Sequence, residues 1–251
     1  MNTRRNVSIS TGGQGPGVNS FTFTGRNDHF MGDFMRRFTV GLALLAFVSV
    51  CVLFRPAAAQ SSAEGKNGAA QSTIVLFGDS LIAGYGLPEQ DGLAPNLAES
   101  LKNAGVNARV INSGVSGDTT AAGLARLDWA MVDKPDLVVL ELGANDALRG
   151  VEPTQTRTNL EQIIEKLQEQ QTAVLLVGMM APPNMGKEYG QEFNAIYPDL
   201  AAKYNLPLYP FFLDGVVADP ALNQQDGMHP NAKGVDVIVG KITPSIVKAL
   251  P

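Results

Sequence analysis

Residues 73–81, Thr-Ile-Val-Leu-Phe-Gly-Asp-Ser-Leu, form a short apolar run that ends in a small-residue turn. The run at 73–77 shows no alternation of polar and apolar residues, which is typical of a strand buried on both faces in a parallel sheet. Gly78 allows the backbone to turn tightly after this strand, and Ser80 lies in the turn. In parallel α/β sheets the functional groups gather at the carboxyl ends of the strands, so this stretch predicts both a fold class and a candidate nucleophile.

The chain after this stretch alternates short apolar runs with longer amphipathic segments. The other expected strands lie at 108–111, 137–141, 173–179 and 206–209. The expected helices lie at 92–104, 119–132, 154–170, 188–204 and 232–250. In the third of these helices apolar residues recur at helical spacing, at Leu160, Ile163, Ile164 and Leu167. Five strands alternating with helices predict right-handed crossovers and a three-layer α/β/α sandwich around a five-stranded parallel sheet, of the flavodoxin-like kind.

Residues 35–59 have the pattern of a secretory signal peptide. Arg36 and Arg37 precede an apolar run at 38–54, and three alanines before Gln60 form a small-residue cleavage pattern. Cleavage predicts a periplasmic or secreted protein without stable membrane insertion. An uncleaved 38–54 run would instead anchor the chain in the inner membrane.

The residues before this segment are rich in Gly, Asn, Ser and Thr and show no periodicity, which predicts disorder. A signal peptide normally begins a protein, so we expect that translation starts at Met31 or Met35 rather than at Met1. The expected organisation is a disordered or mis-assigned start, a signal peptide, a polar linker and one folded domain, at 1–34, 35–59, 60–72 and 73–251.

Composition limits the classes of function. The chain has 251 residues, 45% of them hydrophobic, which suits one domain with a two-sided core. A net charge of −5, with no basic cluster in the second half of the chain, argues against a nucleic-acid partner. Cys51, the single cysteine, lies in the apolar run, so the mature chain would have no disulfide and no thiolate. No cluster has metal-ligand spacing, and we expect no metal and no cofactor.

The sequence has two histidines, and His29 lies in the segment that we expect to be lost. His229 stands in the turn-rich stretch 226–231, three residues after Asp226 and ahead of the last expected helix. Asp226 can hold the Nδ1–H group of the imidazole and leave Nε2 free to accept a proton. The alternative is that Asp226 only caps a turn.

Two more loops follow expected strands, at 112–119 and 142–146. Acyl transfer needs hydrogen-bond donors aimed at a developing oxyanion. Gly117 can offer an unobstructed backbone N–H group, Asn145 a side-chain amide and Ser80 its own N–H group. The structural alternatives are a helix start in the first loop, a turn in the second and a helix cap at Asp79 and Ser80.

Taken together, these residues resemble the SGNH (GDSL) hydrolase family over about residues 73–250. The resemblance implies that Ser80, His229 and Asp226 form a catalytic triad and that Ser80, Gly117 and Asn145 form the oxyanion hole. The stretches GDSLIAGYGL, SGDTTAAGLARL, ELGANDALRG, AIYPDLA and DGMHPN are most similar to secreted bacterial esterases of this family. That similarity implies a monomer that hydrolyses acyl thioesters, lysophospholipids and aryl esters through an acyl-enzyme.

The same resemblance suggests that 146–151 is a mobile lid and that 180–185 is an acyl-chain wall. The expected substrate contacts are Asp146, Leu148, Met180, Ala181 and Pro182. For the methionines, simple core packing is the alternative. Two other functions remain open: a carbohydrate O-acetyl esterase with the same catalytic set, and a non-catalytic envelope-binding module. The module is disfavoured because all five functional positions hold competent residue types.

Overall fold

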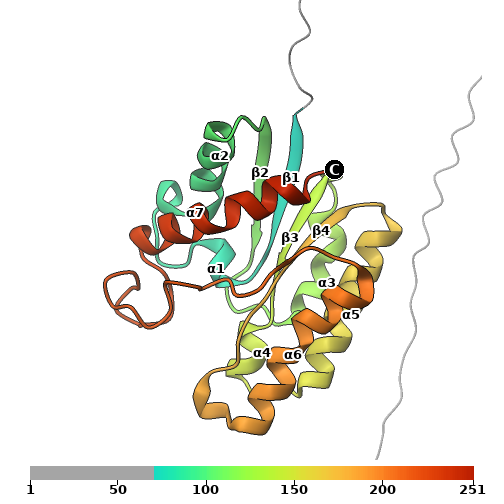
Figure 1. The fold of residues 1–251 in the computed structure, drawn as a ribbon, viewed down its shortest axis with the longest axis vertical. Coiled ribbons are helices and arrows are strands. Elements are labelled where there is room, and N and C mark those ends of the chain that lie inside the picture. The colour runs from blue at the N-terminus through green and yellow to red at the C-terminus, as the bar shows by residue number, and fades with distance from the viewer. Residues whose placement is uncertain (1–70) are drawn as a thin grey trace, which may run out of the picture. The chain divides into compact units, whose positions relative to one another are not determined.

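The computed structural model describes residues 71–251, and these form a parallel sheet between two layers of helices (Figure 1). The strands are β1 (Ser72–Gly78), β2 (Ala108–Gly114), β3 (Leu137–Glu141), β4 (Ala173–Val177) and β5 (Leu208–Tyr209). All neighbours pair in parallel, in the order β2-β1-β3-β4-β5. The predicted five-stranded α/β/α sandwich is therefore confirmed.

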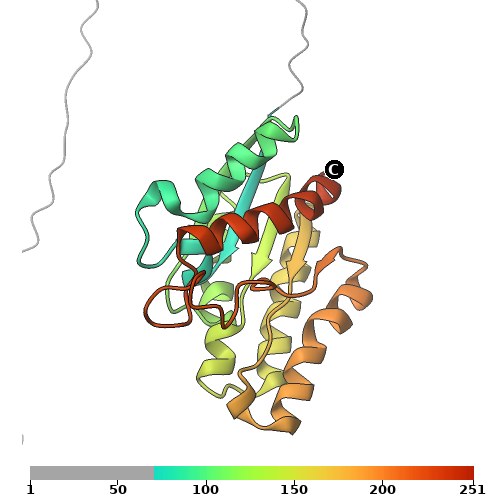
Figure 2. The same cartoon turned by 60° about the vertical axis from the view of Figure 1, so that its left-hand side comes forward.

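The five predicted helices are present with nearly the expected bounds: α2 (Leu93–Asn103), α3 (Thr120–Ala130), α5 (Pro153–Glu169), α6 (Lys187–Tyr204) and α7 (Ala232–Ala249). Helices α2 and α7 pack together on one face of the sheet, and α3, α5 and α6 cover the other (Figures 1 and 2). The apolar stripe of α5 is fully buried, at Leu160, Ile163, Ile164 and Leu167. Burial of this stripe against the sheet explains why its sequence period is helical.

Four short helical segments were not predicted: α1 (Ser80–Ala83), η1 (Glu89–Asp91), α4 (Ala144–Leu148) and η2 (Pro183–Met185). Each has five residues or fewer, too short to show a periodic apolar face. Helices α1 and α4 begin directly after the turns that follow β1 and β3, so they carry side chains of the site.

Strand β4 ends at Val177, two residues before the predicted end at 179. The backbone of Gly178 lies so close to the next segment that a Cβ there would be 2.1 Å from the carbonyl oxygen of Pro210. Strand β5 is only two residues long because prolines flank it, and a proline has no N–H group to extend the ladder. The chain after β4 therefore leaves the sheet early, and Met179 lines a pocket instead of pairing.

Three strands end at the same level of the sheet. Gly78 of β1 is paired with Gly114 of β2 on one side and with Glu141 of β3 on the other. The three loops that hold the candidate residues therefore start side by side at the carboxyl edge, as expected for a parallel sheet.

The expected start, signal peptide and nearly all of the linker, at 1–34, 35–59 and 60–70, lie outside the described residues. Within the described part, the first strand begins at Ser72, one residue before the expected start of the domain. Between residues 71 and 251, no helix has the length and apolar character needed to cross a membrane.

Candidate active site

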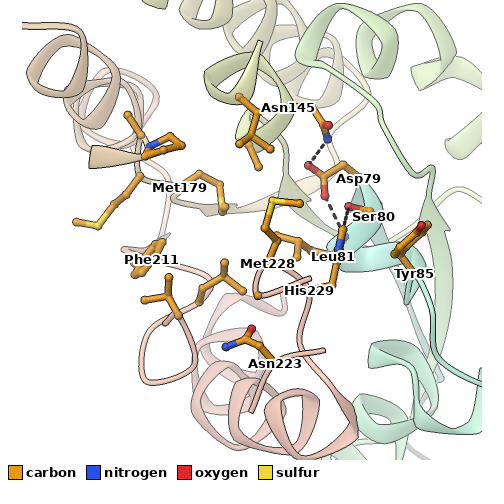
Figure 3. A pocket seen from close by; sticks show the side chains of 18 of the residues that line it. Asp79, Ser80, Leu81, Tyr85, Asn145, Met179, Phe211, Asn223, Met228 and His229 are labelled. Carbon is orange, nitrogen blue, oxygen red and sulfur yellow. Dashed lines mark hydrogen bonds between the residues drawn. The ribbon is translucent and has the colours of Figure 1, made fainter. Parts of the chain in front are cut away.

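Ser80 is the first residue of α1, in the turn that follows β1. The side chain of Asp79 caps this helix, because its Oδ1 accepts the N–H group of Leu81 at 3.0 Å. The hydroxyl of Ser80 remains free of the cap and lies 2.9 Å from Nε2 of His229 (Figure 3). Asp79 therefore caps the helix, and the hydroxyl of its neighbour Ser80 stays available to act as the nucleophile that we expect.

Asp226 holds His229 from the other side. Its Oδ2 lies 2.6 Å from Nδ1 of the imidazole, and its Oδ1 accepts the backbone N–H groups of Met228 and His229 at 2.9 and 3.0 Å. These hydrogen bonds, first those from the two backbone groups and then that from the imidazole, lower the pKa of Asp226 to about 2. Asp226 thus caps the turn with one oxygen and orients the imidazole with the other, as a carboxylate.

The histidine loop is fastened at both ends. Asn231 caps α7, with its Oδ1 accepting the N–H group of Gly234 at 3.1 Å. Gln224 donates its backbone N–H group to the carbonyl of His229 at 2.8 Å, and its side-chain amide donates to the carbonyls of Tyr85 and Pro230 at 2.7 and 2.9 Å. The imidazole is therefore positioned by the α1 side of the site as well as by its own loop.

The expected oxyanion donors Gly117 and Asn145 line the same pocket as Ser80. Gly117 has a φ of 87°, in the left-handed region that favours glycine. Asn145, the second residue of α4, donates from Nδ2 to Oδ2 of Asp79 at 3.0 Å. An amide nitrogen carries two hydrogens, so one can bind Asp79 while the other serves a substrate oxygen.

Two arginines hold the Gly117 loop, and the sequence analysis identified neither. Arg149 donates to the carbonyl of Gly117 at 2.8 Å, and Arg126 forms an ion pair with Asp118. Arg126 also donates to the carbonyl of Gly78 at 2.9 Å and lies 4.2 Å from the centre of the Phe77 ring. One guanidinium therefore joins the turn that holds Ser80 to the loop that holds Gly117. An arginine in an amphipathic helix normally lies on the solvated face. The position of Arg126 in the sequence therefore did not indicate a role in the site.

A second carboxyl group is buried beneath the nucleophile turn. Glu141 is fully buried at the end of β3, and its Oε2 accepts the N–H group of Asp79 at 3.4 Å. Within residues 71–251 its Oε1 has no hydrogen-bond partner. Burial raises the pKa of Glu141 well above the usual value and that of Asp79 to about 6. Asp79 accepts two good hydrogen bonds, so we assign the charge to Asp79 and the proton to Glu141.

Asp146, an expected substrate contact, lies outside the pocket lining. Asp146 is 1% exposed, does not line the pocket, and accepts hydrogen bonds from the backbone and hydroxyl of Thr120 and from the hydroxyl of Thr156. Consecutive residues of a helix point about 100° apart. Asn145 therefore faces Ser80 while Asp146 faces the start of α3, where it fixes α4 in place.

The pocket is an apolar cavity of about 580 Å³ beside Ser80. Four of the five expected substrate contacts, Leu148, Met180, Ala181 and Pro182, line it. The pocket is also lined by residues that the sequence did not predict, three that follow β5 and one neighbour of His229: Phe211, Leu213, Val217 and Met228. The apolar residues within 211–217 could have indicated this part of the pocket. Their spacing matches neither a helix nor a strand, so the sequence predicted no element there. Across residues 71–251, no group of three or more His, Cys, Asp or Glu is placed to bind a metal.

Comparison with known proteins agrees with this geometry. Residues 76–237 match the model of the GDSL-like Lipase/Acylhydrolase family. The chain is 38% identical to an arylesterase of Vibrio mimicus over 72% of this chain and 91% of that protein. It is 39% identical to thioesterase 1/protease 1/lysophospholipase L1 of Escherichia coli K12 over 65% of this chain and 77% of that protein.

Among solved structures, the SGNH-hydrolase family esterase AlinE4 is similar, with 48% identity and a TM-score of 0.61 over 73% of this chain and 98% of that one. The family match covers the end of β1, the loops that hold Gly117 and Asn145, and His229. These findings confirm the resemblance noted in the sequence: the chain belongs to the GDSL-like lipase/acylhydrolase family and is a carboxylic ester hydrolase.

Proposed function

We propose that this chain hydrolyses acyl esters and thioesters with Ser80 as nucleophile, His229 as general base and Asp226 as the carboxylate that orients and stabilises the imidazole. The observation that carries the proposal is the array of contacts from Ser80 Oγ to His229 Nε2 at 2.9 Å and from His229 Nδ1 to Asp226 at 2.6 Å. This array borders an apolar pocket, where an acyl carbonyl can approach the hydroxyl.

The reaction proceeds in two acyl transfers. His229 takes the proton of Ser80 as the oxygen attacks the acyl carbonyl, and Asp226 stabilises the imidazolium that forms. The imidazolium then protonates the leaving alkoxide, phenoxide or thiolate, which departs and leaves Ser80 acylated. Water, deprotonated by His229, attacks the acyl-enzyme and releases the carboxylic acid together with the free serine.

Three donors are available for the tetrahedral oxyanion: the backbone N–H groups of Ser80 and Gly117 and the amide of Asn145. All three residues line the pocket. Removal of one oxyanion donor costs on the order of a hundred- to a thousandfold in kcat. We therefore expect Asn145→Ala to lower kcat by roughly that factor while the protein still folds.

The shape of the pocket favours an acyl chain over a short acetyl group. Its apolar side is formed by residues such as Met179, Phe211 and Leu213, and its volume is about 580 Å³. The names of the relatives, an arylesterase and a thioesterase and lysophospholipase, agree with aryl esters, acyl thioesters and lysophospholipids as the substrates of this chain. Leu148, Met180, Ala181 and Pro182 would contact the chain of the substrate.

A series of p-nitrophenyl esters from acetyl to palmitoyl tests this assignment against a carbohydrate O-acetyl esterase. We expect kcat/KM to rise with chain length beyond acetyl, because each added methylene buries apolar surface in the pocket. Activity confined to the acetyl ester would contradict the acyl-chain assignment. No hydrolysis of any ester in the series would favour a binding module.

We further propose that the enzyme is exported through cleavage of 35–59 and acts as a monomer without cofactor, metal or nucleic-acid partner. The proposal is supported by the signal-peptide pattern that ends before Gln60. N-terminal sequencing of the protein from the periplasm or medium should find a start near Gln60. A peptide from residues 6–26 in that product would contradict both the cleavage and the later translation start.

A further inference from the structure

Tyr85 occupies a fixed place beside the catalytic histidine. It follows α1 between Gly84 and Gly86, whose φ values of 77° and 75° lie in the left-handed region. Its backbone N–H group donates to the carbonyl of Ser80 at 3.1 Å, and its own carbonyl accepts the amide of Gln224 at 2.7 Å. The backbone of Tyr85 is thus tied to both the nucleophile turn and the histidine loop.

The side chain of Tyr85 contacts the ring of His229 and is otherwise largely exposed. Its ring centre lies 4.6 Å from that of His229, with the two planes tilted by 38°, and the residue is 53% exposed. Tyr85 borders the pocket on the opposite side of Ser80 from Met179 and Phe211 (Figure 3). An open aromatic face therefore lies next to the group that must deliver a proton.

The direction of proton transfer decides which part of the substrate meets this face. His229 must reach the leaving oxygen or sulfur to protonate it, so that atom lies on the His229 side of Ser80. The acyl chain takes the other direction, into the apolar pocket. A group attached to the leaving atom consequently extends along Tyr85.

We propose that Tyr85 determines leaving-group specificity, by stacking its ring on the flat aromatic leaving group of an aryl ester during acylation. This inference rests on the function proposed above. Aromatic pairs gain more than their buried area alone, through offset or tilted ring contacts. A saturated leaving group of equal acidity gains no such contact, so the ring raises the rate for aryl esters selectively.

Tyr85 could instead serve only to pack against His229 and hold it in place. In that case its loss would slow all esters by the same factor, because every substrate uses the same base. A comparison between two leaving groups separates these roles.

The experiment compares phenyl butyrate with hexafluoroisopropyl butyrate, an aliphatic ester whose leaving alcohol has an acidity close to that of phenol. Both esters form the same butyryl-enzyme, so the ratio of their kcat/KM values reports acylation alone. The ratio is measured for the wild type, Tyr85→Leu, Tyr85→Phe and Trp129→Leu. Trp129 is a matched control because it is 83% exposed on α3 and does not line the pocket.

Tyr85→Leu should lower the phenyl-to-alkyl ratio about three- to tenfold, the range expected for one aromatic pair. Tyr85→Phe and Trp129→Leu should retain the wild-type ratio. An unchanged ratio in Tyr85→Leu, whether both rates fall together or neither falls, would overturn the inference while ester hydrolysis by the wild type keeps the proposed function intact. A wild type that hydrolyses neither ester would refute the proposed function itself.

Discussion

Asp79 and Ser80 are adjacent residues with opposite surroundings. Ser80 opens to the pocket, whereas Asp79 is fully buried, next to the buried Glu141 and hydrogen-bonded to Asn145. The carboxylate of Asp79 therefore fixes the amide that we assign to the oxyanion. Burial disfavours the ionised form of both carboxyl groups and raises both pKa values, and for Glu141 the nearby charge of Asp79 adds to the rise.

The free energy of unfolding should depend on pH because of the raised pKa of Asp79 in this buried pair. The pKa of Asp79 is about 6 in the folded state, above its ordinary 3.8, so the folded protein binds the proton more tightly than the unfolded chain. Stability contributed in this way is present at low pH and is lost as pH rises from about 4 through about 6. Asp79→Asn has no carboxyl group at this position and should not show this loss. The difference in free energy of unfolding between Asp79→Asn and the wild type should therefore shift in favour of the variant between pH 4 and 7, on the order of 2 kcal/mol.

Urea unfolding at several pH values measures the effect. Asp214→Asn is the control, because that carboxylate pairs with Lys241 at the surface and is well exposed. A difference between wild type and Asp79→Asn that stays constant over this pH range would contradict the assignment. In the same variant the hydrogen bond that holds Asn145 loses its charged acceptor, and kcat should fall about ten- to a hundredfold.

At the scale of elements, the site is assembled from loops that start at one edge of the sheet. The nucleophile turn follows β1, the Gly117 loop follows β2, Asn145 follows β3, and the histidine loop precedes α7. Arg126, on α3, joins the first two through Gly78 and Asp118. A side chain on a neighbouring helix thus holds the turn of Ser80 and the loop of Gly117, our proposed nucleophile and oxyanion donor, at a fixed spacing.

Arg126→Met should lower both stability and catalysis. It leaves Asp118 buried without its ion pair and the carbonyl of Gly78 without this donor, which should cost about 2–4 kcal/mol in free energy of unfolding. Because the displaced loop holds Gly117, kcat should fall more than KM rises.

The matched control is Arg109→Met, which breaks an exposed pair with Asp133 and should cost less than about 1 kcal/mol. Chemical denaturation measures the free energy of unfolding of both variants, and steady-state kinetics measure their kcat and KM. Equal effects of the two substitutions on stability and kcat would show that Arg126 has no special role.

The sequence predicted the helices and strands that show a recognisable apolar pattern. It did not predict the short helical segments, which are too short to show one. The five long helices and the order of strands and helices follow from apolar spacing, as α5 illustrates. The early end of β4 could not be predicted, because it depends on a close approach of Gly178 to Pro210 in the next segment.

For the site, Ser80, Gly117, Asn145, Asp226 and His229 could be selected because each stands in a loop next to an expected strand or helix. Nothing in the sequence singled out Glu141, at the end of an expected strand, or Arg126, in an expected helix, and Asp146 was predicted as a substrate contact. Their real partners are distant in sequence and follow only from the packing of the elements.

At the scale of the whole molecule, the chain enters the domain at Ser72, at the amino edge of the sheet, whereas Ser80 lies at the carboxyl edge (Figure 1). Every residue that we assign to the triad, the oxyanion donors and the pocket lies between residues 79 and 229. We therefore assign no role in the proposed chemistry to a group from the first 59 residues.

A chain that begins at Gln60 should consequently keep the activity of the longer chain. We expect kcat/KM for p-nitrophenyl butyrate to agree within about twofold between the two forms, with equal thermal stability of the domain. A large loss of activity on removal of residues 1–59, with the domain still folded, would show that the site is incomplete without them.

The proposed mechanism depends on Ser80, activated by His229, forming the covalent acyl intermediate. Mass mapping of the protein after treatment with a fluorophosphonate tests this step. We expect one phosphonyl group per chain, on the peptide that contains Ser80, with no label in Ser80→Ala and much slower labelling in His229→Ala. Labelling of Ser80→Ala at another serine, or an active esterase whose Ser80 stays unmodified, would contradict it.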